Sequence, residues 1–475
     1  MPASSATGTA TIAVRDPYRG EVIGEVPCCG PAEVDAACQA AAAALAAGDF
    51  PAHARAQVLD RAAVLLGERA EELSALITAE TGKAIRYARA EVTRAAETFR
   101  FAAAEARTLG GEVVPTEATP AGVGRLGLAL RLPVGVVAAI TPFNFPLNTV
   151  AHKVAPAIAA GCPVVLKPAP QTPLTALRLA ALLTEAGLPE SWLNVVTDSE
   201  AEAGAPLVTH PVPAMVTFTG SPEVGWGIAA AASRKKVALE LGSNAPVIVE
   251  PGVPLAEVAA KIAEGAYAVA GQACIAVQRV LAHRSVHDEL RDLLAAAADR
   301  LVVGDPTDDR TDVGPLISGT ATGRVLSWVE EARAGGAQVV AGGTLVDRCV
   351  RPTVVDRPAP GSKLRTSEVF GPVLAVIPYD TFDEAVAIAN ETRYGLQAGV
   401  FTPDVTTALR AARELNFGGV IVNDVPTVRL DQQPYGGIGD SGNTREGPAA
   451  AVAAMTEVRY VSLQGLPGGV AGGRS

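Results

Sequence analysis

Short apolar segments alternate with longer helical patterns between residues 133 and 241, and this alternation limits the folds open to the chain. We expect strands at residues 136–140, 163–167, 193–196, 215–219 and 237–241. We expect helices at residues 148–160, 173–186 and 221–233. Because parallel strands are joined by a crossover, usually a helix, the pattern predicts a parallel sheet in an α/β fold. Ligands of such sheets bind at the carboxyl ends of the strands.

The rest of the chain predicts further helices and strands. Residues 8–27 predict a strand hairpin, residues 31–109 a run of helices, and residues 112–134 an exposed β-ribbon with a period near two. A second βα series begins near Ala245. Its expected elements are helices at 255–270, 286–301 and 382–390, and strands at 338–340, 375–378 and 419–422.

Composition excludes several classes of protein. In 475 residues, 49% are hydrophobic and 19% charged, so the chain can bury a large core. The net charge of −11 argues against nucleic-acid or anionic-membrane partners, which need a basic face. With six cysteines, five histidines and no C-x-x-C pair, neither a disulfide scaffold nor a zinc site is expected. No targeting or membrane segment is apparent, so we expect a cytoplasmic protein.

Three residues in the βα regions are candidate catalytic residues. Cys274 follows an expected helix in Gly271-Gln-Ala-Cys274, where a thiolate is a nucleophile and a buried structural cysteine is the alternative. Glu240 ends an apolar strand, where burial makes a carboxylate a general base and exposure to solvent is the alternative. Asn144 lies between Pro142 and Pro146, so it is either a rigid donor to an oxyanion or an ordinary turn residue.

Two further strand ends face the presumed ligand edge. Gly220 and Ser221 form a turn between a strand and a helix, and helix N-termini attract phosphate. The spacing is not G-x-G-x-x-G, so the common dinucleotide fingerprint is absent. Lys167 ends another strand, and a surface lysine is its alternative interpretation.

Taken together, these motifs resemble the aldehyde dehydrogenase superfamily over about residues 8–463. The matching segments, in the family's order, are Thr141-Pro-Phe-Asn144-Phe-Pro, Leu166-Lys167-Pro, Phe218-Thr-Gly220-Ser221, Leu239-Glu240-Leu-Gly242, Gly271-Gln-Ala-Cys274, Glu368-Val-Phe370-Gly-Pro and Pro434-Tyr-Gly436-Gly437 with Ser441-Gly442. The 34 residues from Glu240 to Cys274 also suit the family.

The resemblance implies a catalytic mechanism. Cys274 attacks the aldehyde and Asn144 holds the oxyanion, while Glu240 activates water to hydrolyse the thioester. Lys153 and Glu446 match proton-relay positions. The implied contacts to NAD+ or NADP+ are Thr141, Pro142, Phe143, Lys167, Gly220, Ser221, Gly242, Glu368 and Phe370. Pro170 stands where many NAD-preferring members carry Glu, which makes NADP+ plausible, and no metal is implied.

For the substrate, residues 423–435 resemble the branch that handles lactaldehyde, glyceraldehyde 3-phosphate and phosphono-aldehydes. Arg429 in this segment is a candidate to grip an anionic group, with Arg100 and Arg279 as helpers, and a structural ion pair is its alternative role. The rival activities are a CoA-acylating dehydrogenase, against which Glu240 argues, and a catalytically silent structural member of the family.

The resemblance also divides the chain into two interleaved parallel-sheet, Rossmann-like lobes and a β-ribbon arm. The implied cofactor-binding domain comprises residues 1–111, 133–241 and 434–456, and the catalytic domain comprises residues 242–433. Residues 112–132 and 457–464 form the oligomerisation arm, and residues 465–475 a flexible tail. The arm implies a homodimer or homotetramer.

Overall fold

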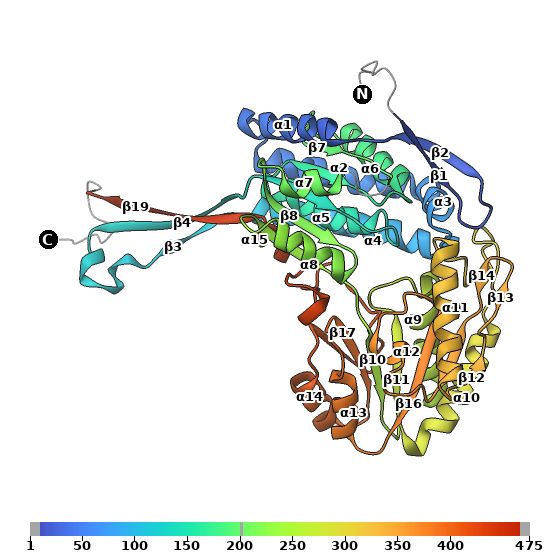
Figure 1. Ribbon diagram of the computed structural model, residues 1–475. Helices are drawn as coiled ribbons and strands as arrows, with labels where there is room; N and C mark the ends of the chain where they lie inside the picture. Colours follow the sequence, from blue (N-terminus) through green and yellow to red (C-terminus); the bar gives the residue numbers. More distant parts are fainter. Residues whose placement is uncertain (1–9, 200–202, 466–475) are drawn as a thin grey trace.

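The computed structural model describes residues 10–199 and 203–465. Two lobes, each built on its own sheet, lie one above the other, and a long β-ribbon extends from the upper lobe (Figure 1). Of the tail expected at 465–475, residues 466–475 lie outside the described part. The expected α/β class with parallel sheets is confirmed.

The upper lobe contains a five-stranded parallel sheet in the order β7-β6-β5-β8-β9. Its strands are β5 (Val136–Ile140), β6 (Val164–Lys167), β7 (Leu193–Val195), β8 (Pro213–Thr219) and β9 (Lys236–Glu240). The connecting helices are α5 (Asn148–Ala160), α6 (Pro173–Glu185), α7 (Gly204–Thr209) and α8 (Pro222–Ala231). Each expected strand and helix of this region is present within a few residues.

The chain before this sheet supplies most of the helices that cover it. These are α1 (Pro31–Ala47), α2 (Ala52–Glu68), α3 (Ala70–Thr81) and α4 (Ile85–Thr108), preceded by the hairpin of β1 (Thr11–Arg15) and β2 (Val22–Pro27). Apolar side chains of α2 and α4, such as Leu59 and Phe99, are buried in one core with α5. Burial of this kind supplies the main favourable term in folding.

The lower lobe contains a seven-stranded sheet in the order β12-β15-β16-β11-β10-β17-β18, parallel except for the edge strand β12. Its strands are β10 (Ala245–Val249), β11 (Val277–His283), β12 (Gln338–Ala341), β15 (Thr353–Asp356), β16 (Val373–Tyr379), β17 (Gln397–Phe401) and β18 (Gly419–Val422). Its helices are α9 (Leu255–Tyr267), α10 (Arg284–Arg300), α11 (Gly319–Ala334), α12 (Lys363–Thr366), α13 (Phe382–Asn390) and α14 (Val405–Glu414). A small hairpin joins β13 (Leu345–Val346) and β14 (Cys349–Val350).

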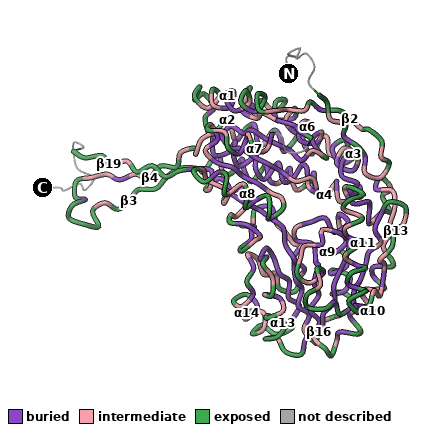
Figure 2. Tube along the Cα trace, in the orientation of Figure 1, coloured by how far each residue is buried: buried purple, intermediate pink, exposed green. Residues whose placement is uncertain are grey.

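The expected β-ribbon is a three-stranded antiparallel sheet, in the order β19-β4-β3. Its strands are β3 (Gly111–Val114), β4 (Arg125–Pro133) and β19 (Thr456–Gln464), with the short turns η1 (Thr116–Ala118) and η2 (Pro120–Gly122) at its tip. The tube in Figure 2 is mostly exposed along this arm and mostly buried within the lobes. The chain returns to the arm through η4 (Gly439–Ser441) and α15 (Pro448–Ala454) beneath the upper sheet.

Several features of the lower lobe differ from expectation. The strands β15 and β17 and the helices α11 and α14 were not expected. The helix expected at 255–270 ends at Tyr267, because Val269 and Ala270 adopt left-handed backbone conformations with φ of 55° and 53° in the turn η3 (Ala268–Gly271). The central strand β11 was not expected, since Gln278 and Arg279 interrupt its apolar pattern. None of the helices in the described part of the chain is both long and apolar enough to cross a lipid bilayer.

Candidate active site

The seven-stranded sheet presents Cys274 at the end of a sharp backbone turn. After α9, the left-handed residues of η3 lead to Gly271, whose φ is +69° and where a Cβ atom would lie 2.2 Å from the carbonyl oxygen of Gly371. Only glycine fits such an approach. The turn brings the Cys274 sulfur to 2.9 Å from the hydroxyl oxygen of Tyr435. Burial raises the pKa of the Cys274 thiol to about 11, against the lowering effect of Tyr435 and Arg429.

Asn144 comes to the same place from the other lobe. It follows β5, and its side-chain amide donates to the carbonyl oxygen of Gln272 at 2.7 Å, two residues before Cys274. The loop that carries it is fixed by Glu91 of α4, which accepts from the backbone N–H groups of Leu147 and Asn148 at 2.9 and 3.0 Å. This hydrogen bond to Gln272 brings the Asn144 amide close to Cys274 in the chain.

Glu240 is the third residue of the group and is buried without a hydrogen-bond partner. It ends β9 with 3% of its surface exposed, and neither carboxylate oxygen is bonded within residues 10–199 and 203–465. Burial and the nearby charge of Glu446 raise its pKa well above the usual range. Gly436 makes room for it, since a Cβ atom there would lie 2.7 Å from Glu240 Oε1. A buried carboxyl with a raised pKa and free oxygens is suited to act as a general base toward water.

Glu446 joins the segments around this group through two ion pairs. Its Oε1 lies 3.0 Å from Lys153 Nζ of α5, and its Oε2 lies 2.9 Å from Arg429 Nη2 of the loop after β18. Burial opposes ionisation of Glu446, but the two cations outweigh it and hold the pKa of this carboxyl far below its usual range. The Arg429 guanidinium lies 3.8 Å from the centroid of the Tyr435 ring.

Several of the residues expected to hold a cofactor lie at or just after the carboxyl ends of strands in the five-stranded sheet. Thr141 and Pro142 begin the loop after β5, and the Thr141 N–H donates to the carbonyl oxygen of Lys167 at 3.1 Å. Phe143 meets Phe370 edge to face, with ring centroids 5.9 Å apart. These contacts bring the first and last segments of the expected set together.

Two turns of the expected cofactor set are also formed. Ser221 caps α8 by accepting from the Val224 N–H at 3.4 Å, directly after Gly220. Glu368 accepts from the Ser243 N–H at 2.9 Å, and a Cβ atom at Gly242 would lie 2.3 Å from Glu368 Oε2. Burial raises the pKa of Glu368 to about 7.

Lys167 is not an ordinary surface lysine. Its Nζ lies 2.7 Å from Oδ1 of Asp198, and both side chains are buried at the carboxyl end of the five-stranded sheet. Asp198 is in turn fixed by the Ala203 N–H, which donates to Oδ2 at 2.9 Å. Asp198 could not be singled out from the sequence, because no local pattern shows that the loop after β7 reaches Lys167.

Arg279 does not reach the site, and the expectation that it helps bind substrate is wrong. It is 1% exposed in the centre of the seven-stranded sheet, and its guanidinium donates to the backbone carbonyls of Asn244, Ile388 and Ala389. A cation whose donors are satisfied by backbone oxygens serves the fold. Burial lowers its pKa to about 9.

Arg100 does not join the group either. It lies exposed on α4 and pairs with Glu97 one turn earlier. Within the described part of the chain its ion pair is with Glu97 and not with the residues around Cys274, so the structure does not support a substrate contact for it. By contrast, Arg429 is brought to the group, although its ion pair with Glu446 is also the structural role that we gave as the alternative.

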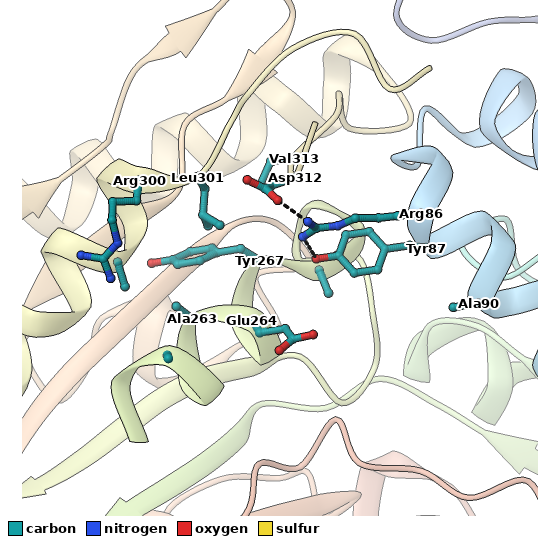
Figure 3. A pocket seen from close by; sticks show the side chains of 13 residues that line it. Arg86, Tyr87, Ala90, Ala263, Glu264, Tyr267, Arg300, Leu301, Asp312 and Val313 are labelled. Carbon is teal, nitrogen blue, oxygen red and sulfur yellow. Dashed lines mark hydrogen bonds and ion pairs between the residues drawn. The ribbon is translucent and has the colours of Figure 1, made fainter. Parts of the chain in front are cut away.

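A cavity of about 640 Å³ lies between the start of α4 and α9 (Figure 3). Arg86 points into it and pairs with Asp312 and with the Tyr87 hydroxyl. Its lining residues are Arg86, Tyr87, Ala90, Ala260, Ala263, Glu264, Tyr267, Ala268, Ala297, Arg300, Leu301, Asp312 and Val313. None of them is a nucleophilic cysteine or serine, so the group around Cys274 and not this cavity is the candidate active site. No cluster able to hold a metal ion occurs within residues 10–199 and 203–465.

Comparison with known proteins agrees with this fold. A model of the aldehyde dehydrogenase family matches residues 4–461. A 3-sulfolactaldehyde dehydrogenase of Priestia aryabhattai is 45% identical over 414 residues, which cover 87% of this chain and 87% of that protein. The crystal structure of aldehyde dehydrogenase 21 from Physcomitrella patens, in complex with its product succinate, has a TM-score of 0.94 and 39% identity, covering 97% of this chain and 96% of that one.

A second solved structure is similar at the same level. Glyceraldehyde-3-phosphate dehydrogenase GapN of Methanocaldococcus jannaschii, complexed with NADP, has a TM-score of 0.93 and 35% identity, covering 97% of this chain and 100% of that one. The family model spans nearly the whole chain, and the relatives are 35–45% identical. Together they define the class of this protein as an oxidoreductase. The chain belongs to the aldehyde dehydrogenase family.

Proposed function

We propose that this protein oxidises an aldehyde to a carboxylic acid with NAD(P)+ and does not need CoA. The observation that carries the proposal is that three separate segments of two lobes meet around Cys274: Asn144 bonds Gln272 two residues before it, Tyr435 lies against its sulfur, and Glu240 lies against the adjacent Gly436. The buried Glu240 carboxylate has no hydrogen-bond partner within residues 10–199 and 203–465, and it argues for hydrolysis of an acyl-enzyme, since water is a weak nucleophile that needs a base to take its proton.

The residues expected to hold a cofactor fit a dinucleotide. Ser221 opens α8, whose N-terminal amides attract phosphate, and Val224 and Trp226 of the same helix are 53% and 40% exposed, which gives a nucleobase an apolar surface. Lys167 and Glu368 provide polar groups for the two riboses. When bound, NAD(P)+ supplies the acceptor for the two electrons that leave the aldehyde carbon.

The protein's own residues perform the remaining steps. The Cys274 sulfur bonds to the aldehyde carbon, and the carbonyl oxygen becomes an oxyanion to which the Asn144 amide donates. After oxidation a thioester joins the acyl group to Cys274. Glu240 then takes a proton from water, the resulting hydroxide attacks the acyl carbon, and the carbon–sulfur bond breaks to release acid and thiolate. Lys153 and Glu446 lie close enough to Glu240 to influence its proton.

A spectrophotometric assay tests this function. The reduced nicotinamide should appear when aldehyde and NAD(P)+ are supplied without CoA, and Cys274→Ala should reduce turnover by at least about a thousandfold because the covalent step is lost. Cys349→Ala, a buried cysteine of the β13–β14 hairpin, is the matched control and should retain turnover. A signal that requires CoA would favour the acylating activity, and no signal with a broad aldehyde panel would favour a silent protein.

The substrate we favour is a small polar or anionic aldehyde of the lactaldehyde, glyceraldehyde 3-phosphate or phosphono-aldehyde type. The Arg429 guanidinium lies against the Tyr435 ring beside Cys274. Among the described residues around Cys274, it donates one hydrogen bond, to Glu446. A guanidinium carries five donors in a planar fork that suits carboxylate, phosphate and sulfonate oxygens. The names of the relatives are consistent with such substrates, since they include a sulfolactaldehyde and a phosphorylated aldehyde.

Replacement of Arg429 tests this choice. Arg429→Ala should raise KM about 10- to 100-fold for anionic aldehydes and much less for neutral aldehydes of the same size, because a bond to a charged group contributes roughly 1.5–3 kcal/mol. Arg100→Ala is the control and should change neither KM. Equal losses for anionic and neutral aldehydes would show that Arg429 acts only through its ion pair with Glu446.

Asp198 leads us to favour NAD+ over NADP+. Pro170 alone would allow NADP+, but Asp198 places a carboxylate beside Lys167, 2.7 Å from its ammonium. Because we place the adenosine ribose at Lys167, this carboxylate would repel a 2′-phosphate and accept a hydrogen bond from a 2′-hydroxyl.

Asp198→Asn tests that preference. The change should raise the ratio of kcat/KM for NADP+ to that for NAD+ on the order of tenfold, since it removes one charge from the site and releases the Lys167 ammonium. Asp292→Asn on the exposed face of α10 is the control. An unchanged ratio would mean that the pair of Lys167 with Asp198 only stabilises the fold.

The arm is the surface through which we propose that the protein forms a homodimer or homotetramer. Its outer strands β3 and β19 are sheet edges, and Val113, Val458 and Tyr460 are more than half exposed there. Long exposed edges with apolar side chains favour pairing with another chain.

A further inference from the structure

Tyr435 is held rigidly against the sulfur of Cys274. Its hydroxyl oxygen lies 2.9 Å from that sulfur, and its side chain is 2% exposed. The backbone is fixed on the opposite side, because Tyr435 and Glu446 exchange N–H to carbonyl bonds of 3.0 and 2.6 Å. Gly436 allows the next turn of chain, since a Cβ atom there would lie 2.0 Å from the carbonyl oxygen of Thr444. The phenol therefore has little freedom to turn away from Cys274.

The direction of this hydrogen bond follows from the two acidities. Burial and the neighbouring charge of Cys274 raise the pKa of the Tyr435 phenol well above its usual value. The phenol is thus a weaker acid than a free tyrosine, and it is the donor whenever the sulfur is a thiolate, because a thiolate has no proton to give. Bonds in which one partner is ionised are about twice as strong as neutral ones, so this contact favours the thiolate over the thiol.

The buried charges around Cys274 favour the same form. The groups that face its sulfur are Tyr435, Arg429, Glu240 and Glu368. Arg429 and Lys153 share the single carboxylate of Glu446, which leaves one positive charge without a partner in this cluster. A negative charge on the sulfur would balance it.

The other titratable groups nearby change this charge balance little at neutral pH. Burial and Arg429 lower the pKa of His152 to about 4, so this ring is neutral and adds no further positive charge. Burial and the charge of Glu446 raise the pKa of Glu240 well above its usual range, which disfavours its ionised form. Glu368, with a pKa raised to about 7, is only partly ionised and is bonded to the Ser243 amide.

We propose, on the basis of the function proposed above, that Tyr435 is a further catalytic residue, whose hydroxyl donates a hydrogen bond to the Cys274 thiolate and keeps it ready for attack while Arg429 supplies the balancing charge. No proton moves to or from Tyr435 in this role. The bond weakens when the sulfur joins the aldehyde carbon, because the sulfur then carries no charge.

Alkylation of the free enzyme tests the proposal. Iodoacetamide modifies thiolates, and the rate at Cys274 is followed by mass spectrometry of its peptide across pH, without aldehyde or cofactor. Tyr435→Phe should raise the midpoint of this profile by about one pH unit, since a bond to a charged group contributes roughly 1.5–3 kcal/mol and one unit corresponds to about 1.4 kcal/mol. Tyr18→Phe, in the turn between β1 and β2, is the control and should leave the midpoint unchanged.

A second variant tests the charge. Arg429→Gln should also raise the midpoint, and thermal melting of each variant confirms that it is folded. An unchanged or lowered midpoint in folded Tyr435→Phe would overturn the role of the phenol, and an unchanged midpoint in Arg429→Gln would overturn the role of the charge. Because alkylation requires no turnover, a failed dehydrogenase assay with the expected shift would contradict only the proposed function.

Discussion

The two ion pairs of Glu446 are the interaction on which the rest of the site depends. The carboxylate lies between Lys153 of α5 and Arg429 of the loop after β18, and its backbone pairs with Tyr435. It thus connects the upper lobe, the lower lobe and the returning chain at one buried point. Removing one partner of a buried pair leaves an uncompensated charge, which costs about 3–5 kcal/mol, so these segments are held together strongly.

The same ion pairs also determine how much negative charge the groups around Cys274 can carry. With two cations and one carboxylate, the cluster accommodates one further negative charge, and Cys274 and Glu240 are the two groups able to carry it. The proposed mechanism needs these charges in sequence, first on the sulfur for attack and then on Glu240 for activation of water. Once the sulfur is bound to the acyl carbon it is uncharged, which favours ionisation of Glu240. Groups coupled in this way titrate as a pair.

Much of the fold and part of the site could be predicted from the sequence. The alternation of strands and helices predicted the five-stranded sheet, and the ordered motifs predicted that Cys274, Asn144 and Glu240 would meet. Local patterns failed where tertiary contacts decide. Arg279 suggested a ligand site because it is charged, yet three backbone carbonyls from distant segments enclose it. The contacts of Tyr435 with Cys274 and of Asp198 with Lys167 join residues far apart in the chain, so no spacing indicates them.

The most direct test of the account is mass spectrometry of Glu240→Gln after incubation with NAD+ and an aldehyde that the wild-type enzyme oxidises. The account predicts about one reduced nicotinamide per active site and an acyl group that accumulates on the Cys274 peptide, because the thioester forms but water is not activated. Sustained turnover by this variant, or a reduced nicotinamide formed with no acyl group on Cys274, would contradict it.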